Sequence, residues 1–251
     1  MSGHSKWATI KHKKGLLDAK RGKMFTKLIR ELTIAAKMGG SDPGGNPRLR
    51  SAIADAKGQS MPGDTIKRAI QRGAGEIEGA SYDDVLYEGT GPGGTLFLVE
   101  GVTDNRNRTV AEIRKIFEKN NGVLGGASTA GWAFDRKGII QVAKETATED
   151  QLMDVAVGAG AEDYADAGET WEVTSPPAAL GAVLEALEKA NVTVKGSKVG
   201  YVPKTKKPIS GRDAEVALNL AEALDDHDDV QNVFADFDVS DEEMARIASL
   251  P

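Results

Sequence analysis

The spacing of apolar residues changes near Ser81, and this change limits what the chain can fold into. Before it, apolar residues such as Phe25, Leu28 and Leu32 recur every three or four positions, which is the period of an amphipathic helix. After it come short strand-like runs such as TLFLVEGV, which alternate with helical segments. The sequence therefore predicts an α+β chain that opens with a small helical domain.

Glycine and proline divide the first part of the chain into three short helices. The first begins near Met24 and ends at Gly39-Gly40, Pro47 suits the first position of the second, and the third ends at Gly73. The stretch GAGEIEGAS that follows has the composition of a linker. We expect residues 1–78 to form a basic arm followed by a three-helix domain.

Two ferredoxin-like units are predicted beyond the linker. The segment TGPGG joins two strand-like runs as a hairpin, and a Thr-x-x-Glu capping box predicts that the next helix starts near Thr109. A final helix and strand complete a β-α-β-β-α-β set begun at Val85, with a second, acidic α+β unit inserted in its middle. We expect one domain in residues 79–137 and 204–251, and the inserted domain in residues 138–203.

Charge is divided unevenly between these parts. Residues 1–75 hold 16 Lys and Arg against 5 Asp and Glu, a net charge of +11. The remaining residues hold 16 against 33, a net charge of −17, which together make the formal net charge of −6. This asymmetry favours a basic module that binds a polyanion and an acidic body that limits indiscriminate binding, over a simple attraction between domains.

The N-terminal arm is the strongest candidate for contacting phosphates. Its cations can neutralise phosphates and release condensed counterions. A basic stripe on the first helix, formed by Lys23, Lys27, Arg30 and Lys37, extends this charge onto ordered structure. Trp7 and His12 lie among the lysines, where a ring can stack on an unpaired base; an anchor that pins the arm to the helical domain is an equal alternative for Trp7. The candidate nucleic-acid-binding residues here are Lys6, Trp7, Lys11, His12, Lys13, Lys14, Lys20, Arg21, Lys23, Lys27 and Arg30.

A second candidate site is the segment DNRNRT. Arg106 and Arg108 precede the predicted helix N-terminus, where free backbone N–H groups and the helix dipole favour an anion. Two guanidinium groups there would form a phosphate pocket, and a loop in which they bond neighbouring carbonyls is the alternative. Lys67, Arg68 and Arg72 are weaker additions.

Catalytic and metal chemistry receive little support. The chain has no cysteine, which excludes disulfides, thiolate nucleophiles and Cys-based zinc sites and suits a reducing cytosol. No nucleophile elbow is present, and the aspartates of Asp225–Asp229 around His227 are more typical of a solvated helix end than of a cation site. No apolar run approaches the roughly 18 residues of a membrane span. We expect no catalytic residue, metal, cofactor or membrane contact, and a monomeric cytoplasmic protein.

Five segments closely resemble the YebC/PmpR family, which includes the mitochondrial translational activator of cytochrome c oxidase. They are GHSKWATIKHKKGLLDAKRGKMFTKLIREL, LYEGTGPGG, TDNRNRT, GWAF and DDVQNVFADFD. The resemblance implies a helical N-terminal domain and two α+β domains, the third inserted into the second. One departure is GVLGGASTAGWAF, where the family more often has Gly-Ser-Val before the strand.

The resemblance implies two functions, and the residues fit both. Bacterial members carry a transcriptional-regulator label and some are described as DNA binders, whereas others resemble translation factors that relieve ribosome stalling at proline-rich stretches. We expect a non-enzymatic nucleic-acid-binding regulator of transcription, with a translation factor that binds the ribosome and its RNA as the alternative. The chain lacks the signature of a base-reading recognition helix, and a lysine-rich arm with aromatic residues suits structured RNA as well as duplex DNA.

Overall fold

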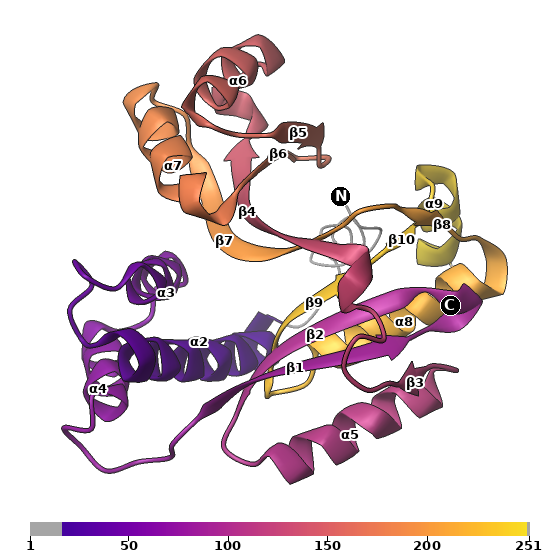
Figure 1. Cartoon of the computed structure of the whole chain (residues 1–251), viewed down its shortest axis with the longest axis horizontal. Coiled ribbons are helices and arrows are strands. Elements are labelled where there is room, and N and C mark those ends of the chain that lie inside the picture. Colours follow the sequence, from indigo (N-terminus) through magenta and orange to yellow (C-terminus); the bar gives the residue numbers. More distant parts are fainter. Residues whose placement is uncertain (1–16, 250–251) are drawn as a thin grey trace.

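The structure, a computed structural model, describes the backbone of residues 17–249 and the side chains from residue 22 onward. It contains an N-terminal helical region and two four-stranded antiparallel sheets (Figure 1). The predicted α+β fold class is confirmed. Among the described residues, no helix is both long and apolar enough to cross a lipid bilayer.

The helical region consists of α2 (Leu17–Gly39), α3 (Pro47–Gly58) and α4 (Gly63–Gly73). The predicted helix ends at Gly39 and Gly73 and the predicted start at Pro47 are confirmed, although α2 begins earlier than Met24. Their apolar faces meet in one core cluster because each helix places a buried residue every three or four positions. Its fully or nearly fully buried members include Leu32, Ala36, Leu49, Ala56 and Ile66.

The side chain of Asn46 forms hydrogen bonds to the end of α2 and to the start of α3. Its side-chain oxygen accepts a hydrogen bond from the Leu49 backbone N–H at 3.1 Å and so caps the N-terminus of α3. Its amide group donates to the carbonyl oxygens of Ala35 and Gly40, each at 2.8 Å, near the C-terminus of α2. One buried side chain therefore satisfies backbone groups of both helix ends.

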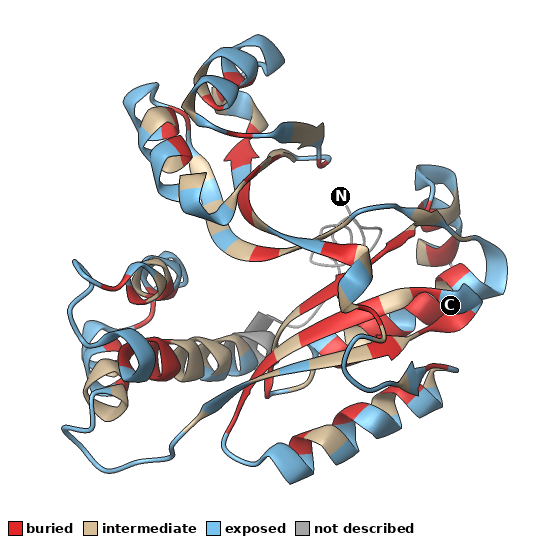
Figure 2. Ribbon diagram, in the orientation of Figure 1, coloured by how far each residue is buried: buried red, intermediate tan, exposed pale blue. Residues whose placement is uncertain are grey.

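The first sheet has the strand order β3-β1-β2-β9, and α5 and α8 cover one of its faces (Figure 1). Phe97, Phe117 and Phe237 meet in its core, where Figure 2 shows buried residues on both the strands and the helices. The elements of this unit are β1 (Asp83–Thr90), β2 (Leu96–Thr103), α5 (Arg106–Lys119), β3 (Val123–Leu124), α8 (Gly211–Asp225) and β9 (Val230–Ala235).

The chain order of this unit differs from the prediction. Its elements follow as β-β-α-β-α-β, not β-α-β-β-α-β, because the turn around Pro92–Gly94 pairs β1 directly with β2. The hairpin itself was predicted from TGPGG and is confirmed. Gly93 and Gly94 have φ of 66° and 70°, which glycine adopts without the steric penalty that a Cβ atom would bring.

The second sheet is inserted between β3 and α8 of the first unit and has the strand order β5-β6-β4-β7. Its chain order is β-α-β-β-α-β with every pair antiparallel, which is the ferredoxin-like arrangement. Its apolar core lies between the sheet and its two helices. The elements are β4 (Phe134–Ala143), α6 (Glu149–Val155), β5 (Asp163–Asp166), β6 (Thr170–Ser175), α7 (Leu180–Lys189) and β7 (Val194–Pro203).

The long strands β4 and β7 connect the two sheets. They pair from Phe134↔Pro203 to Val142↔Val194, so the predicted boundary at residue 138 lies within a continuous strand. A separate apolar cluster joins residues of the two sheets and includes Leu98 on β2, Phe134 on β4 and Phe234 on β9. The remaining elements are β8 (Lys207–Pro208), which pairs with β10 (Phe237–Asp238), and α9 (Asp241–Ala248).

Replacing Asn46 with alanine should lower the free energy of unfolding by about 2 kcal/mol, because it removes the helix cap and leaves two carbonyl groups without their donor. Urea unfolding followed by circular dichroism measures this loss. Ser41→Ala, at an exposed position of the same loop, is the control and should change stability by less than about 0.5 kcal/mol. Equal stability of the two variants would contradict the role given to Asn46.

Candidate nucleic-acid interface

The basic stripe of α2 faces the acidic turn at the end of α8. Lys23 pairs with Asp226 at 3.4 Å, and Lys27 pairs with Asp225 at 3.7 Å. Two further hydrogen bonds, from the lysine Nζ atoms to the backbone carbonyls of the same aspartates, reinforce these pairs. The stripe predicted to meet phosphates is therefore matched in this structure by carboxylates of the chain itself.

Asp229 is the centre of this contact. Its Oδ1 accepts from Arg30 Nη1 of α2 at 2.8 Å, and its Oδ2 accepts from Arg108 Nη2 of α5 at 3.0 Å. The hydroxyl groups of Thr103 and Thr109 also donate to Oδ2. Only 2% of Asp229 is exposed, so a buried carboxylate is satisfied by two cations and two hydroxyls.

A glycine allows the backbone of Asp229 to lie against the sheet. The Val102 N–H donates to the Asp229 carbonyl at 2.8 Å, beside a register shift between Glu100 and Gly101. A Cβ atom on Gly101 would lie 2.6 Å from that carbonyl oxygen, closer than van der Waals contact allows. The small residue at the end of β2 thus permits the approach that carries the carboxylate to Thr103 and Thr109.

The pKa of Asp229 is lower than its ordinary value. Burial opposes the charged form, but the hydrogen bonds from Thr109 and Arg108 and the charge of Arg30 outweigh it. Because the folded-state pKa is below the unfolded value, ionised Asp229 stabilises the fold at neutral pH. That contribution is lost as the pH falls through the folded-state pKa, below about pH 4.

The helix that carries the predicted arginine site begins earlier than expected. The predicted start at Thr109 is wrong: α5 begins at Arg106, and the side chain of Asn105 caps it by accepting from the Arg108 N–H at 3.1 Å. Asn is as good a cap as Thr, and Thr109 is instead buried and bonded to Asp229. Arg106 and Arg108 therefore lie in the first turn of α5.

The two arginines differ in how firmly they are held. Arg106 is 64% exposed and has a single long ion pair, 3.5 Å from Asp83. Arg108 bridges Asp229 at 3.0 Å and Asp104 at 2.8 Å, and the hydrogen bonds that it donates to these carboxylates raise its pKa above the ordinary value. The first turn of α5 thus presents Arg108, which two carboxylates hold although its side chain is 42% exposed, and Arg106, which is more exposed and more weakly held.

The acidic cluster around His227 serves these contacts. The His227 ring accepts from the Asp229 N–H through Nδ1 at 3.1 Å, which leaves its Nε2 to donate to Glu112 at 3.0 Å. Throughout the described part of the chain, no group of three or more His, Cys, Asp and Glu side chains is arranged to hold a metal ion. The cluster is more than a solvated helix end, because Asp225, Asp226 and Asp229 each meet a cation.

The weaker candidates on α4 are more accessible than the stripe. Lys67 and Arg68 are exposed, and neither has a carboxylate partner in residues 22–249. Ile66 and Ala69 face the core of the helical region, which directs the two basic residues between them outward. Arg72 is half-buried, and its Nε lies beside Gly79. The helical spacing of the apolar residues Ile66 and Ala69 in the sequence already indicated that Lys67 and Arg68 face outward.

Part of the predicted site is not described. Lys6, Trp7, Lys11, His12, Lys13 and Lys14 lie outside the described residues, and so do the side chains of Lys20 and Arg21. Their role in binding nucleic acid stays a prediction. The described residues that the fold brings together are Lys23, Lys27 and Arg30 from α2 and Arg108 from α5, all around one acidic turn.

Two family models match the chain. The model of the TACO1/YebC protein N-terminal domain matches residues 5–76, and that of the TACO1/YebC second and third domain matches residues 82–237. The chain belongs to the TACO1/YebC family. The first matched range contains the arm and the helical region, and the second contains both sheets, as far as β10, so Asp229 joins the two matched ranges through Arg30.

Relatives in this family match over their whole length. A "probable transcriptional regulatory protein" of Geobacter sulfurreducens is 53% identical over 247 residues, which is 98% of this chain and 100% of the relative. Another of the same name from Desulfotalea psychrophila is 54% identical over 251 residues, covering 99% and 100%. The crystal structure of a conserved hypothetical protein of Aquifex aeolicus has a TM-score of 0.86 and 42% identity, covering 92% of this chain and 96% of that one.

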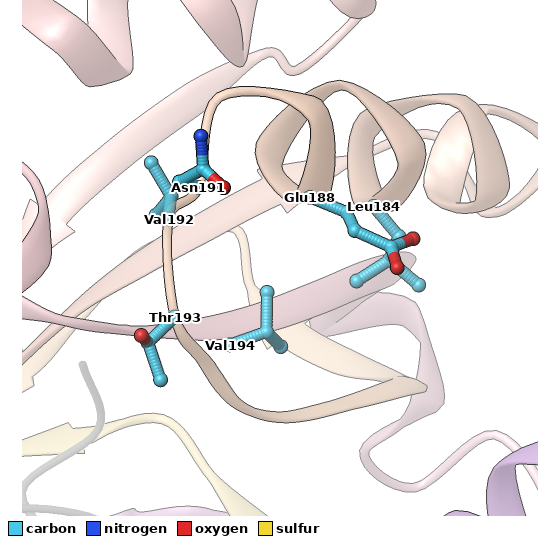
Figure 3. Close-up of a pocket in the computed structure, with 6 residues that line it drawn as sticks. All are labelled: Leu184, Glu188, Asn191, Val192, Thr193 and Val194. Carbon is cyan, nitrogen blue, oxygen red and sulfur yellow. The ribbon is translucent and has the colours of Figure 1, made fainter.

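A surface hollow of about 420 Å³ lies away from this interface, at the end of α7 (Figure 3). Its lining residues are Leu184, Glu188, Asn191, Val192, Thr193 and Val194. The one charged side chain among them is that of Glu188, so the lining offers no positive charge to a phosphate. In this member of the TACO1/YebC family, the predicted basic sites and the hollow are separate features.

Replacing Asp229 with asparagine should lower the free energy of unfolding at pH 7 by about 3 kcal/mol, because Arg30 and Arg108 lose the buried charge that they share. The difference from the wild type should shrink as the pH falls below about 4, where Asp229 becomes protonated. Urea unfolding across this pH range measures both effects. Asp228→Asn, which removes an exposed carboxylate one residue away, is the control, and an equal loss in both variants would contradict the assignment.

Proposed function

We propose that this protein is a non-enzymatic nucleic-acid-binding regulator that acts on DNA to control transcription. Full-length relatives that are about half identical carry the name "probable transcriptional regulatory protein", which supports the regulatory role. The observation that carries the nucleic-acid interface is geometric. Asp229 brings Arg30 and Arg108, two cations from separate predicted sites, onto one carboxylate.

Because Arg30 and Arg108 share Asp229, the basic stripe of α2 and the arginines of α5 form one basic surface. The stripe lies on α2 and the arginines lie on α5, and the sequence places them far apart. In the fold, Lys23, Lys27, Arg30 and Arg108 surround the turn that follows α8, and Arg106 lies in the same first turn as Arg108. A polyanion that follows the arm onto α2 would reach the start of α5 next.

Exposure separates the cations into two groups. The side chains of Lys27 and Arg30 are only 18% and 13% exposed, so they hold the helical region against the end of α8. Lys23, Arg106 and Arg108 are 47%, 64% and 42% exposed and are accessible to phosphate oxygens. We assign phosphate contacts to these three and to the arm, and a supporting role to Lys27 and Arg30.

Aspartates of the chain itself compete with the ligand for the same cations. Each accessible lysine or arginine meets an aspartate in the free protein, so a phosphate must replace a carboxylate rather than enter an empty site. Competition of this kind weakens non-specific binding, which depends almost entirely on phosphate neutralisation. It also explains why an acidic protein can carry a basic interface without binding every nucleic acid.

A translation factor that binds the ribosome and its RNA is the alternative. Phosphate contacts position a protein on nucleic acid but do not read its sequence, so the cations of α2 and α5 suit RNA as well as DNA. Crosslinking in cells, followed by sequencing of the bound nucleic acid, separates the two functions. We expect enrichment of promoter DNA that is lost in a Lys11→Glu, Lys13→Glu, Lys14→Glu variant. Enrichment of ribosomal RNA instead would overturn the DNA proposal in favour of the alternative.

Removing the carboxylate that competes for Lys23 should strengthen binding. Asp226→Asn should raise the affinity for a duplex DNA fragment by about 2- to 5-fold at about 150 mM salt, since an exposed ion pair of this kind has a free energy of up to about 1 kcal/mol. Fluorescence anisotropy measures the change. Asp228→Asn changes the net charge equally but frees no cation, and should have less than half the effect in kcal/mol. An equal gain in both variants would show that only net charge matters.

A further inference from the structure

Trp132 is exposed on a turn that no part of the proposed interface uses. It lies in the short 3₁₀ helix Gly131–Ala133, just before β4, and 66% of the residue is exposed. Its indole Nε1 donates to the Thr129 carbonyl at 3.2 Å, which restrains the ring with its polar edge turned toward the protein backbone. Most of its aromatic surface is therefore accessible to a ligand that can stack on it.

The turn that carries Trp132 is held rigidly. The carboxylate of Glu88 on β1 accepts from the backbone N–H groups of Ser128, Ala130 and Gly131 at 3.1, 2.7 and 2.8 Å. Burial disfavours its charge, but these backbone bonds outweigh it and lower the pKa of Glu88. An ionised Glu88 therefore fixes the backbone that presents the ring, so little conformational entropy is lost when a ligand covers it.

A lysine lies beside the turn that carries the ring. Lys204, which follows β7, donates through Nζ to the Trp132 carbonyl at 2.9 Å and through its backbone N–H to the Ala133 carbonyl at 2.9 Å. Its ion pair with Asp135 is long, at 3.6 Å, and both side chains are about half exposed. Lys206 is exposed and has no partner among the residues that the structure describes. Lys204 thus places positive charge beside the turn of Trp132, and Lys206 follows two residues later in the same segment.

We propose that Trp132, Lys204 and Lys206 form a binding site for single-stranded nucleic acid. The face of the indole stacks on one unpaired base, and the two lysines contact the phosphates on either side of it. Stacking platforms bordered by cations are how proteins bind single strands without reading their sequence. Lys204 at the turn, Lys206 two residues later and the small and polar residues at 128–131 suit an anionic strand better than the apolar face of a partner protein.

This site is separate from the interface around Asp229. It uses the turn before β4 and the segment after β7, whereas the proposed duplex contacts come from α2, α5 and the arm. The inference rests on the proposed function only in that the ligand is a nucleic acid. A protein with both sites can hold a duplex region and an adjacent unpaired region of the same nucleic acid.

Trp132→Ala tests the stacking contact directly. With a fluorescein-labelled uridine or thymidine strand of about ten nucleotides, fluorescence anisotropy should show an affinity about 5- to 100-fold weaker than that of the wild type. Trp132→Phe retains an aromatic face and should lose less than Trp132→Ala. For a duplex of the same length, Trp132→Ala should change the affinity by less than about 2-fold, because the bases of a duplex are not free to stack.

Matched controls separate stacking from general effects. Val123→Ala removes another exposed apolar side chain, 64% exposed, and should leave single-strand affinity unchanged. Lys206→Glu should weaken single-strand binding and lower its salt dependence, whereas Lys189→Glu on α7, whose side chain is 80% exposed, makes the same charge change elsewhere and should have a smaller effect. Circular dichroism melting of each variant confirms that it is folded.

Two results would overturn the proposal. One is unchanged single-strand affinity in Trp132→Ala, and the other is an equal loss for single strand and duplex. If the Lys11→Glu, Lys13→Glu, Lys14→Glu variant loses duplex binding while Trp132→Ala binds both probes normally, the proposed interface stands and the stacking site fails. The reverse pattern, loss of only single-strand binding in Trp132→Ala with duplex binding unaffected by the arm variant, supports the stacking site alone.

Discussion

The buried carboxylate of Asp229 is the contact on which the arrangement of this molecule depends. A charge so far removed from water is stable only when cations and hydrogen-bond donors surround it, and here they come from three elements: Arg30 on α2, Thr103 on β2, and Arg108 and Thr109 on α5. The contacts of the Asp229 carboxylate therefore orient the helical region, the β3-β1-β2-β9 sheet and the first turn of α5 relative to one another. Lys23 and Lys27 extend the same contact along α2 to Asp226 and Asp225.

The same carboxylate contacts limit how the basic surface can bind another anion. In the free protein the cations of α2 and α5 already have carboxylate partners, so the proposed binding of a nucleic acid is an exchange of one anion for another. Under the proposal, exchange weakens binding to phosphates in general, and Lys67 and Arg68 on α4, which have no carboxylate partner among the described residues, add affinity at the edge. Trp132 offers a contact of a different kind, because stacking depends on an accessible base rather than on charge. Together they suit a nucleic acid that has both paired and unpaired parts.

Local patterns predicted much of the fold. The helix ends at Gly39 and Gly73, the start at Pro47 and the hairpin at TGPGG follow from short-range backbone preferences, and all are present. The start of α5 was missed because Asn105 and Thr109 are both good caps, and the choice depended on Asp229, which is distant in the chain and uses the Thr109 hydroxyl. The chain order of the unit around the β3-β1-β2-β9 sheet was predicted wrongly as β-α-β-β-α-β, although the predicted hairpin already placed two strands before the first helix.

The sequence by itself determined the family, the α+β class and the concentration of positive charge near the N-terminus, because motifs, hydrophobic period and charge are properties of neighbouring residues. It also showed the acidic run Asp225–Asp229, but not its purpose. Only the tertiary structure placed that run against the basic stripe and turned two predicted binding sites into one balanced surface. It alone left Trp132 in water beside Lys204. Electrostatic pairing and exposure depend on distances through space, and those distances exist only once the chain has folded.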